Sequence, residues 1–227
     1  GCTSLVSASP ISENRGTGYE YGWTDKIPAN AFKGLDKLQE ISLINTIKTI
    51  GDSAIRDCSS LQELIIPEGV TTIGASAFNG CSSLLELIIP EGVTKIEQRT
   101  FNNCSSLNHL IIPAAVTDIS GHYTFSGCNS LISASPISEN KGTGYEYGWT
   151  ETIPSYAFTD LNKLQTVSIL DTITTIGIRV FMSCSSLQEL IIPDGVTKIE
   201  ERTFADCSSL NHLVIPSTVT SISDWYT

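Results

Sequence analysis

Apolar residues recur at a fixed spacing along almost the whole chain. The phrase CSSLQELIIP and its close variants begin at Cys58, Cys81 and Cys104, 23 residues apart. The alternation of polar and apolar residues in ELI predicts a short strand, and the proline after it ends the strand because proline has no backbone donor. A turn, a second apolar pair and an Ala-Phe pair complete the unit. Such a period predicts a stacked repeat array, in which each unit is one rung.

The first residue of the phrase defines a key position that can be followed through the chain. It is occupied by Cys2, Leu35, Cys58, Cys81, Cys104, Cys128, Leu161, Cys184 and Cys207. Most intervals are 23 or 24 residues, and the intervals after Cys2 and Cys128 are 33 residues. The register therefore predicts a single solenoid domain of nine rungs over residues 1–227.

A longer repeat lies on top of the rungs. The first 24 residues, GCTSLVSASPISENRGTGYEYGWT, return almost unchanged at residues 127–150. This divides the solenoid into super-repeat units 1–126 and 127–227, of which the second is shorter. One rung alone buries too little apolar surface to offset its conformational entropy, so stability must come from stacking.

The phrase C-S-S-L-x-x-L-I-I-P-x-x-V-x-x-I, followed by a phenylalanine, resembles the BspA-like leucine-rich repeats. The resemblance implies a leucine-rich-repeat solenoid of the right-handed β/α superhelix type. It implies a parallel sheet on the concave face, with short strands, turns and 3₁₀ or helical corners elsewhere. Departures are Leu35 and Leu161 at the key position and Ile55 where phenylalanine is usual.

The same resemblance carries expectations about function. Proteins of this family are commonly bacterial or protozoan surface proteins, and some are adhesins for host matrix or for other cells. This implies a cell-surface or extracellular location. The family shares no catalytic residues, so the resemblance implies a chain that is not an enzyme.

The composition narrows the classes of partner that the chain could bind. The formal net charge is −11, which disfavours nucleic acid and anionic membrane surfaces. No apolar run reaches 18 residues, so we expect no membrane insertion in this segment. The N-terminus shows no signal peptide, and we expect the sequence to be part of a longer protein.

The seven cysteines all occupy the key position. An odd number cannot pair completely within the chain, and no C-x-x-C spacing occurs. Disulfides or a metal ladder are the functional alternatives. The regular placement favours buried, reduced thiols, and we assign no metal and no cofactor.

Each 33-residue rung contains an aromatic insertion, at residues 11–24 and 137–150. The aromatic residues of the two insertions are Tyr19, Tyr21, Trp23, Tyr145, Tyr147 and Trp149. Tyrosine and tryptophan offer large rigid contact areas with a polar group, which suits protein or sugar ligands. The alternative is that these side chains fold back and pack against the rim of the solenoid.

A second candidate surface follows the outward residues of the predicted strands. Ile65, Ile88 and Ile111 take the same place in successive rungs and predict an apolar stripe flanked by glutamates. Exposed apolar patches mark protein interaction sites. The alternative is that β-branched residues occur here because they favour strands. We see no catalytic set of nucleophile, base and acid.

These features predict a non-catalytic protein-interaction module, an adhesin whose partner is a host matrix or cell-surface protein. One alternative is a structural spacer that displays other domains. Another is carbohydrate binding through the aromatic insertions. Because a solenoid presents unpaired strand edges at its ends, we also expect end-to-end self-association.

Overall fold

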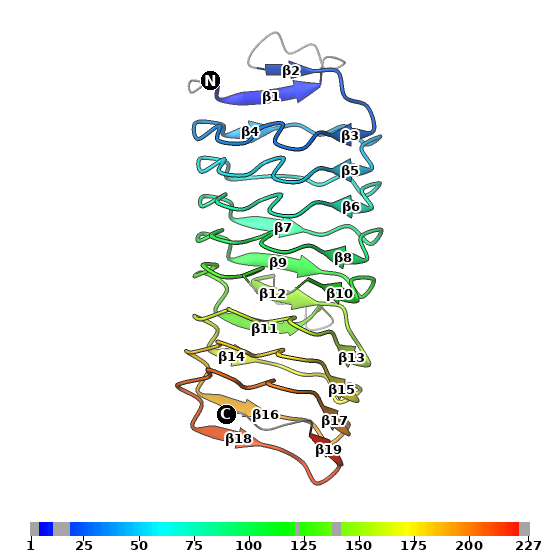
Figure 1. Ribbon diagram of the computed structural model, residues 1–227, viewed down its shortest axis with the longest axis vertical. Coiled ribbons are helices and arrows are strands. Elements are labelled where there is room, and N and C mark those ends of the chain that lie inside the picture. The colour runs from blue at the N-terminus through cyan, green and yellow to red at the C-terminus, as the bar shows by residue number, and fades with distance from the viewer. Residues whose placement is uncertain (1–4, 11–18, 121–122, 138–141, 223–227) are drawn as a thin grey trace.

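The computed structural model describes residues 5–10, 19–120, 123–137 and 142–222, and all regular elements in these ranges are short strands. The rungs stack along one axis with the strands in two columns (Figure 1). Every strand pair is parallel, as a coil that returns to the same face after each rung requires. The predicted leucine-rich-repeat solenoid is confirmed.

The first column contains the strands predicted from the repeated phrase, together with two strands from the aromatic insertions. They are β1 Ser7–Pro10, β2 Tyr19–Tyr21, β4 Glu40–Ile41, β7 Glu86–Ile88, β9 His109–Ile112, β11 Ser133–Pro136, β12 Gly144–Tyr147, β14 Thr166–Val167, β16 Glu189–Ile191 and β18 His212–Val214. In the pair β7 and β9, Leu87 faces Leu110, and both side chains are buried. The second column lies at the other apolar pair of each rung. Its strands are β3 Lys26–Ile27, β5 Thr49–Ile50, β6 Thr72–Ile73, β8 Lys95–Ile96, β10 Asp118–Ile119, β13 Thr152–Ile153, β15 Thr175–Ile176, β17 Lys198–Ile199 and β19 Ser221–Ile222.

The corners between the columns are turns, so the expected helical corners are wrong for the described residues. Each corner contains residues with positive φ, for example Ser76 at 57° and Gly80 at 77°. Every second N–H group of this corner, at residues 76, 78 and 80, points to the next rung, and those between them bond within the corner. The Phe78 N–H donates to the Thr100 carbonyl at 3.1 Å, and the Gly80 N–H donates to the Asn102 carbonyl at 2.8 Å. Donors that a helix would use internally therefore join neighbouring rungs.

The interior is a set of ladders made by equivalent residues. Phe78, Phe101 and Phe125 stack with ring centroids 6.0 and 5.6 Å apart. Phe158, Phe181 and Phe204 continue the stack farther along the chain. Each rung thus covers the apolar face of the one before it, which is how units too small to fold alone become stable together.

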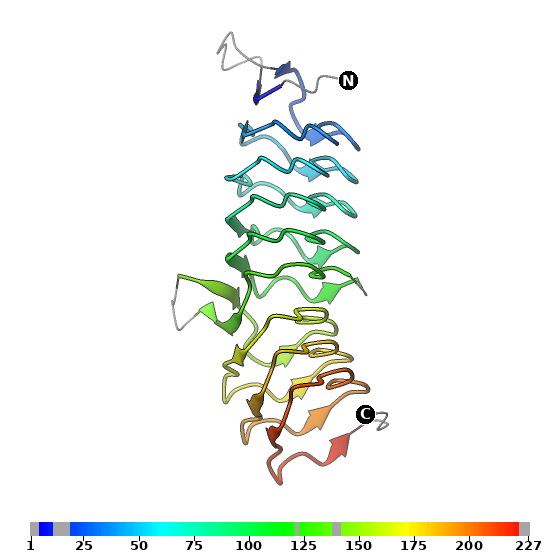
Figure 2. The ribbon, with the colours of Figure 1, turned by 90° about the vertical axis from the view of Figure 1, so that its left-hand side faces the viewer.

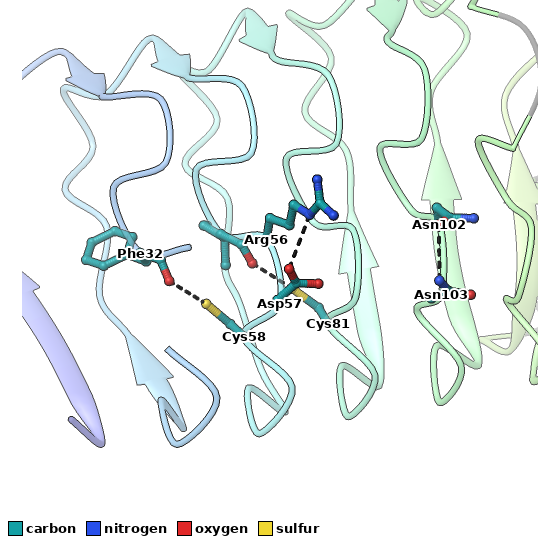
Figure 3. A network of polar contacts seen from close by, with 8 residues as sticks. Phe32, Arg56, Asp57, Cys58, Cys81, Asn102 and Asn103 are labelled. Atoms are coloured by element: carbon teal, nitrogen blue, oxygen red, sulfur yellow. Dashed lines mark hydrogen bonds and ion pairs between the residues drawn. The ribbon is translucent and has the colours of Figure 1, made fainter. Parts of the chain in front are cut away.

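The cysteines form a ladder beside the phenylalanines. The Cys58 thiol donates to the Phe32 carbonyl at 3.1 Å, and the Cys81 thiol donates to the Ile55 carbonyl at 3.1 Å (Figure 3). All described cysteines are free. Burial raises the pKa of the Cys58 thiol to about 12, so it stays protonated and able to donate. The thiols are structural hydrogen-bond donors to the preceding rung.

The two leucines at the key position, Leu35 and Leu161, both follow a long rung. Leu161 follows a long rung, and there Tyr145 lies between Phe125 and Phe158 in the aromatic ladder. The preceding corner is therefore displaced by one layer, and a thiol at this place would lack its usual carbonyl. Leu161 is buried here and needs no hydrogen-bond acceptor. Leu35 also follows a long rung in the sequence.

Candidate functional site

The aromatic insertion of the second unit contributes an additional strand. β12 lies between β9 and β11, so that Tyr145 faces Leu110 on one side and Ala134 on the other. Residues 144–147 therefore belong to the sheet and do not form a loop at the rim of the solenoid. In the first unit, β2 pairs with β1 in the same register, with Tyr19 facing Ala8.

Among the described residues, the additional strand β12 has no counterpart in the second column. β10 pairs with β8 and β13 pairs with β15, but β10 and β13 are not paired with each other. One side of the solenoid thus gains a layer that the other side lacks, and the direction of the stack changes at this level (Figure 2). A groove of about 300 Å³ opens at the gap, lined by Trp149, Thr152 and Gly177 among others.

The structure places the aromatic side chains inside the fold. Tyr145, Tyr147 and Trp149 are all buried. The Tyr147 hydroxyl donates to the Ser168 carbonyl, and the Trp149 indole donates to the Val116 carbonyl, both at 2.7 Å. Buried side chains offer little area to a ligand, so these three residues fit the packing alternative.

The aromatic residues of the first unit are arranged in a similar way. Tyr21 is buried, and its hydroxyl donates to the Ser42 carbonyl at 2.5 Å. Trp23 is half-buried and stacks on Tyr21 with ring centroids 5.1 Å apart. The side chain of Tyr19 lies outside the described residues, although its backbone is part of β2.

Tyr145 joins the two halves of the aromatic ladder. Its ring meets Phe125 and Phe158 edge to face, with centroids 5.4 and 5.1 Å apart. Its hydroxyl is buried and has no hydrogen-bond partner among the described residues. Burial also holds the pKa of Tyr145 well above its usual range. The ring is therefore the part of this side chain that stabilises the fold.

Two glycines at the start of β12 make a matched test of the insertion. Gly144 has φ +83°, and a Cβ there would lie 2.8 Å from the Ser133 carbonyl oxygen; Gly142 has φ +67° and open space around it. We expect Gly144→Ala to lower the free energy of unfolding by about 3 kcal/mol, from backbone strain together with the clash. Gly142→Ala has the strain alone and should cost about 1 kcal/mol. Urea unfolding of both variants measures the difference, and equal losses would show that β12 does not pack closely on Ser133.

A polar cluster lies where β12 joins β9. Glu146 is 2% exposed, and its Oε1 accepts a 2.6 Å hydrogen bond from the Gly142 N–H. His109 lies between two carboxylates, with Nδ1 3.2 Å from Glu86 and Nε2 3.7 Å from Glu146. The carboxylates are on opposite sides of the imidazole, so they suit an ion pair better than a shared metal ion. No group of three metal-binding side chains occurs among the described residues.

The sequence gave no indication that Glu146 lies beside Glu86 and His109. The register that brings Glu146 to this place depends on β12 entering the sheet. The alternation of Tyr145, Glu146 and Tyr147 matches the period of a strand, and it could have indicated that this segment forms one.

The open face of the first unit carries the predicted isoleucine stripe. Ile65 is 84% exposed and Ile88 is 48% exposed, whereas Ile111 is half-buried. With Leu85, 43% exposed, the first two border a groove of about 430 Å³. We call this the isoleucine groove. Its polar lining includes Glu63, Glu68 and Glu86.

The isoleucine groove coincides with an interruption of the first column. Residues 62–66 are described but form no strand, although β4 precedes them and β7 follows. The Leu85 N–H still donates to the Gln62 carbonyl at 3.1 Å. At this interruption the Ile65 side chain is largely exposed.

A second groove lies in the second unit, between the rungs of Thr166 and Ile191. It measures about 730 Å³ and is lined by Thr166, Gln188, Glu189 and Ile191 among others. Ile191 is 58% exposed. The lining of this second groove is more polar than the lining of the isoleucine groove.

Comparison with known proteins identifies a family of repeat proteins. A family model described as BspA type Leucine rich repeat region matches residues 24–138 and 149–226, with six copies. A comparison with curated protein sequences finds no match. No helix in the described ranges has the length and apolar character needed to cross a bilayer.

Solved structures show a similar architecture. A leucine-rich repeat protein from T. pallidum aligns with a TM-score of 0.59 at 23% identity, over 81% of this chain and 78% of that one. A leucine-rich repeat protein from Bacteroides ovatus aligns with a TM-score of 0.42 at 22% identity, over 98% and 76% of the two chains. A leucine rich cell surface protein from Faecalibacterium prausnitzii aligns with a TM-score of 0.39 at 21% identity, over 92% and 82%. The first of these likenesses supports the fold.

Proposed function

The chain belongs to the BspA-type leucine-rich repeat family, and from this premise we propose that it binds a protein partner through the isoleucine groove. Leucine-rich repeat modules generally act in protein interaction, and the family is typically non-catalytic. The finer proposal is that the module belongs to a surface or secreted protein and acts as an adhesin for host matrix or cell-surface proteins. Family membership supports this location and role.

The exposure of Ile65 is the observation that carries the proposal. A β-branched residue in a regular ladder is shielded by its neighbours, but Ile65 is 84% exposed. It adjoins two further exposed apolar side chains, Leu85 and Ile88, in one groove. A contiguous apolar patch with a polar rim is the usual form of a protein contact surface.

The charges around the groove favour a particular kind of partner. Glu63, Glu68 and Glu86 line it, and the chain as a whole carries a formal charge of −11. A partner that combines an apolar ridge with lysine or arginine at its flanks would complement this surface and be steered toward it.

The structural spacer is the second candidate. It is favoured by the burial of Tyr145, Tyr147 and Trp149, which turns the most aromatic segment of the chain into packing. The same burial leaves carbohydrate binding through these side chains without support.

Ile65→Glu tests the binding proposal. Losing a buried isoleucine contact and adding a charge should weaken binding of a matrix or cell-surface protein by at least about 30-fold. Affinity is measured by surface plasmon resonance against a panel of these proteins. The matched control is Ile191→Glu, which makes the same change at the equivalent place in the second groove and should leave binding unchanged.

The outcomes separate the candidates. Wild-type affinity in the Ile65→Glu variant would show that the isoleucine groove is not the binding surface. Failure of the wild-type chain to bind any member of the panel would contradict the adhesin role and favour the spacer.

A further inference from the structure

A polar pocket of about 340 Å³ lies on the corners of four successive rungs. It shares no lining residue with the isoleucine groove or with the second groove. Figure 3 shows two side-chain pairs that line it, Arg56 with Asp57 and Asn102 with Asn103. We call it the corner pocket. The remaining lining residues are Asn79, Arg99 and Tyr123.

Asn79 supplies a buried amide to the corner pocket. It is 8% exposed, and its side chain makes no hydrogen bond to another residue in the described ranges. In the next rung its counterpart Asn102 does have a partner, because the Asn102 Nδ2 donates to the Ser126 carbonyl at 3.1 Å. A buried amide without a partner is costly, and a ligand hydroxyl, which can both donate and accept, would satisfy it.

Arg99 supplies a positive charge to the same pocket. The Arg56 guanidinium has a carboxylate beside it, that of Asp57 at 3.2 Å, whereas Arg99 makes no ion pair with any described residue. This is notable in a chain with a formal charge of −11. The lining therefore carries one positive charge in excess. Its donors lie in the plane of the guanidinium and suit a carboxylate.

Tyr123 closes one end of the pocket with an aromatic ring. The residue is 53% exposed, and the Arg99 guanidinium lies over its ring, 5.6 Å from the centroid. The Tyr123 N–H donates to the Asp160 Oδ2 at 2.8 Å, which fixes the backbone under the ring. An exposed tyrosine ring offers a flat apolar surface with a polar edge, which suits the face of a sugar ring.

We propose that the corner pocket binds a short acidic oligosaccharide, one that carries a carboxylate of the uronic-acid or sialic-acid type. Arg99 pairs with the carboxylate, Tyr123 packs on a sugar ring, and the Asn79 amide bonds to hydroxyl groups. The four rungs extend over about 14 Å at about 4.8 Å per rung, which is room for more than one sugar. The mainly polar lining disfavours an apolar ligand. The pocket is separate from the isoleucine groove, so either proposal can fail without affecting the other.

A glycan array tests the ligand class. It presents uronic-acid and sialic-acid oligosaccharides beside the same oligosaccharides with their carboxylates converted to methyl esters. The full wild-type chain should bind at least one acidic member, and at least about tenfold more tightly than the matching ester, because the ester cannot form the charged hydrogen bonds with Arg99. Binding to no acidic member, or equal binding to acid and ester, would overturn the proposal.

Substitutions then locate the site, with affinities measured by isothermal titration calorimetry on the glycan that the array identifies. Arg99→Gln should weaken binding at least about tenfold. Asn79→Ala should weaken it several-fold while leaving the urea unfolding midpoint of the free chain almost unchanged, because the lost amide has no partner in the free chain.

The matched control is Arg179→Gln. Arg179 lies over the Tyr156 ring at 5.9 Å, so the variant removes the same charge from the same kind of pair, but neither residue lines the corner pocket. It should bind the glycan like wild type. An equal loss in Arg99→Gln and Arg179→Gln would show that the glycan responds to overall charge, and would overturn the site.

Discussion

Alkaline pH should unfold this chain steeply above pH 9. Burial raises the pKa of the thiols of Cys58 and Cys128 from the ordinary 9.0 to about 12. Cys81, Cys104 and Cys184 are shifted in the same direction. The folded state then binds more protons than the unfolded state, so the stabilisation is complete below pH 9 and is lost as the pH rises toward 12.

The size of the effect follows from the number of buried thiols. Burial also raises the pKa of the Cys207 thiol, to about 11. Each thiol contributes about 1.4 kcal/mol per pH unit, so the six give a limiting slope of about 8 kcal/mol per pH unit. Because folded proteins have only about 5–15 kcal/mol to lose, unfolding should be complete within about two pH units. Urea unfolding at a series of pH values, under reducing conditions, measures the slope.

A double variant isolates the thiols from other groups that titrate in this range. Cys81→Ala together with Cys104→Ala removes two of the six thiols, so the slope should fall by about one third. The comparison uses slopes, since the variant will be less stable at every pH. An unchanged slope would show that lysines or tyrosines, and not the cysteine ladder, control alkaline unfolding.

Removal of the Tyr145 ring should be among the most damaging single substitutions. Tyr145→Ala leaves a cavity between Phe125 and Phe158, and we expect a loss of about 3–5 kcal/mol in the free energy of unfolding. Tyr145→Phe keeps the ring and deletes a buried hydroxyl that has no hydrogen-bond partner among the described residues. It should change stability by less than about 1 kcal/mol, in the stabilising direction.

Urea unfolding near neutral pH separates the two variants. If Tyr145→Phe lost as much stability as Tyr145→Ala, the hydroxyl would have to make a hydrogen bond in solution. If Tyr145→Ala were tolerated, the ladder would not depend on a ring at this layer.

The sequence alone was sufficient to predict the repeating rungs, but it was insufficient to predict how the aromatic insertions are built into them. The 23-residue spacing predicted the solenoid, and the buried places of Leu84 and Leu107 follow from it. The insertion was harder because its outcome depends on a non-local choice. Nothing in residues 137–150 alone says that the chain turns back and places β12 between β9 and β11.

Identical segments show the same limit. QELIIP occurs at residues 62–67 and at 188–193, yet only the second copy contains a strand, β16. β16 has β18 as a partner, whereas residues 62–66 are not paired with β4 or β7. Whether a segment forms a strand depends on the neighbouring rungs. Local sequence therefore predicts which side chains point inward better than it predicts which segments pair as strands. The exposure of Ile65 follows from this difference.

The interruption at residues 62–66 has a mechanical consequence. The hydrogen bonds between rungs run along the stack, so tension applied to its two ends acts on the junctions between rungs and opens them one after another. The junctions with the fewest bonds yield first, and in the first column these lie at residues 62–66 and between β14 and β16. A ligand seated in the isoleucine groove would bridge the rung of residues 62–66 and the next, and so would stiffen the chain at one of these weak junctions.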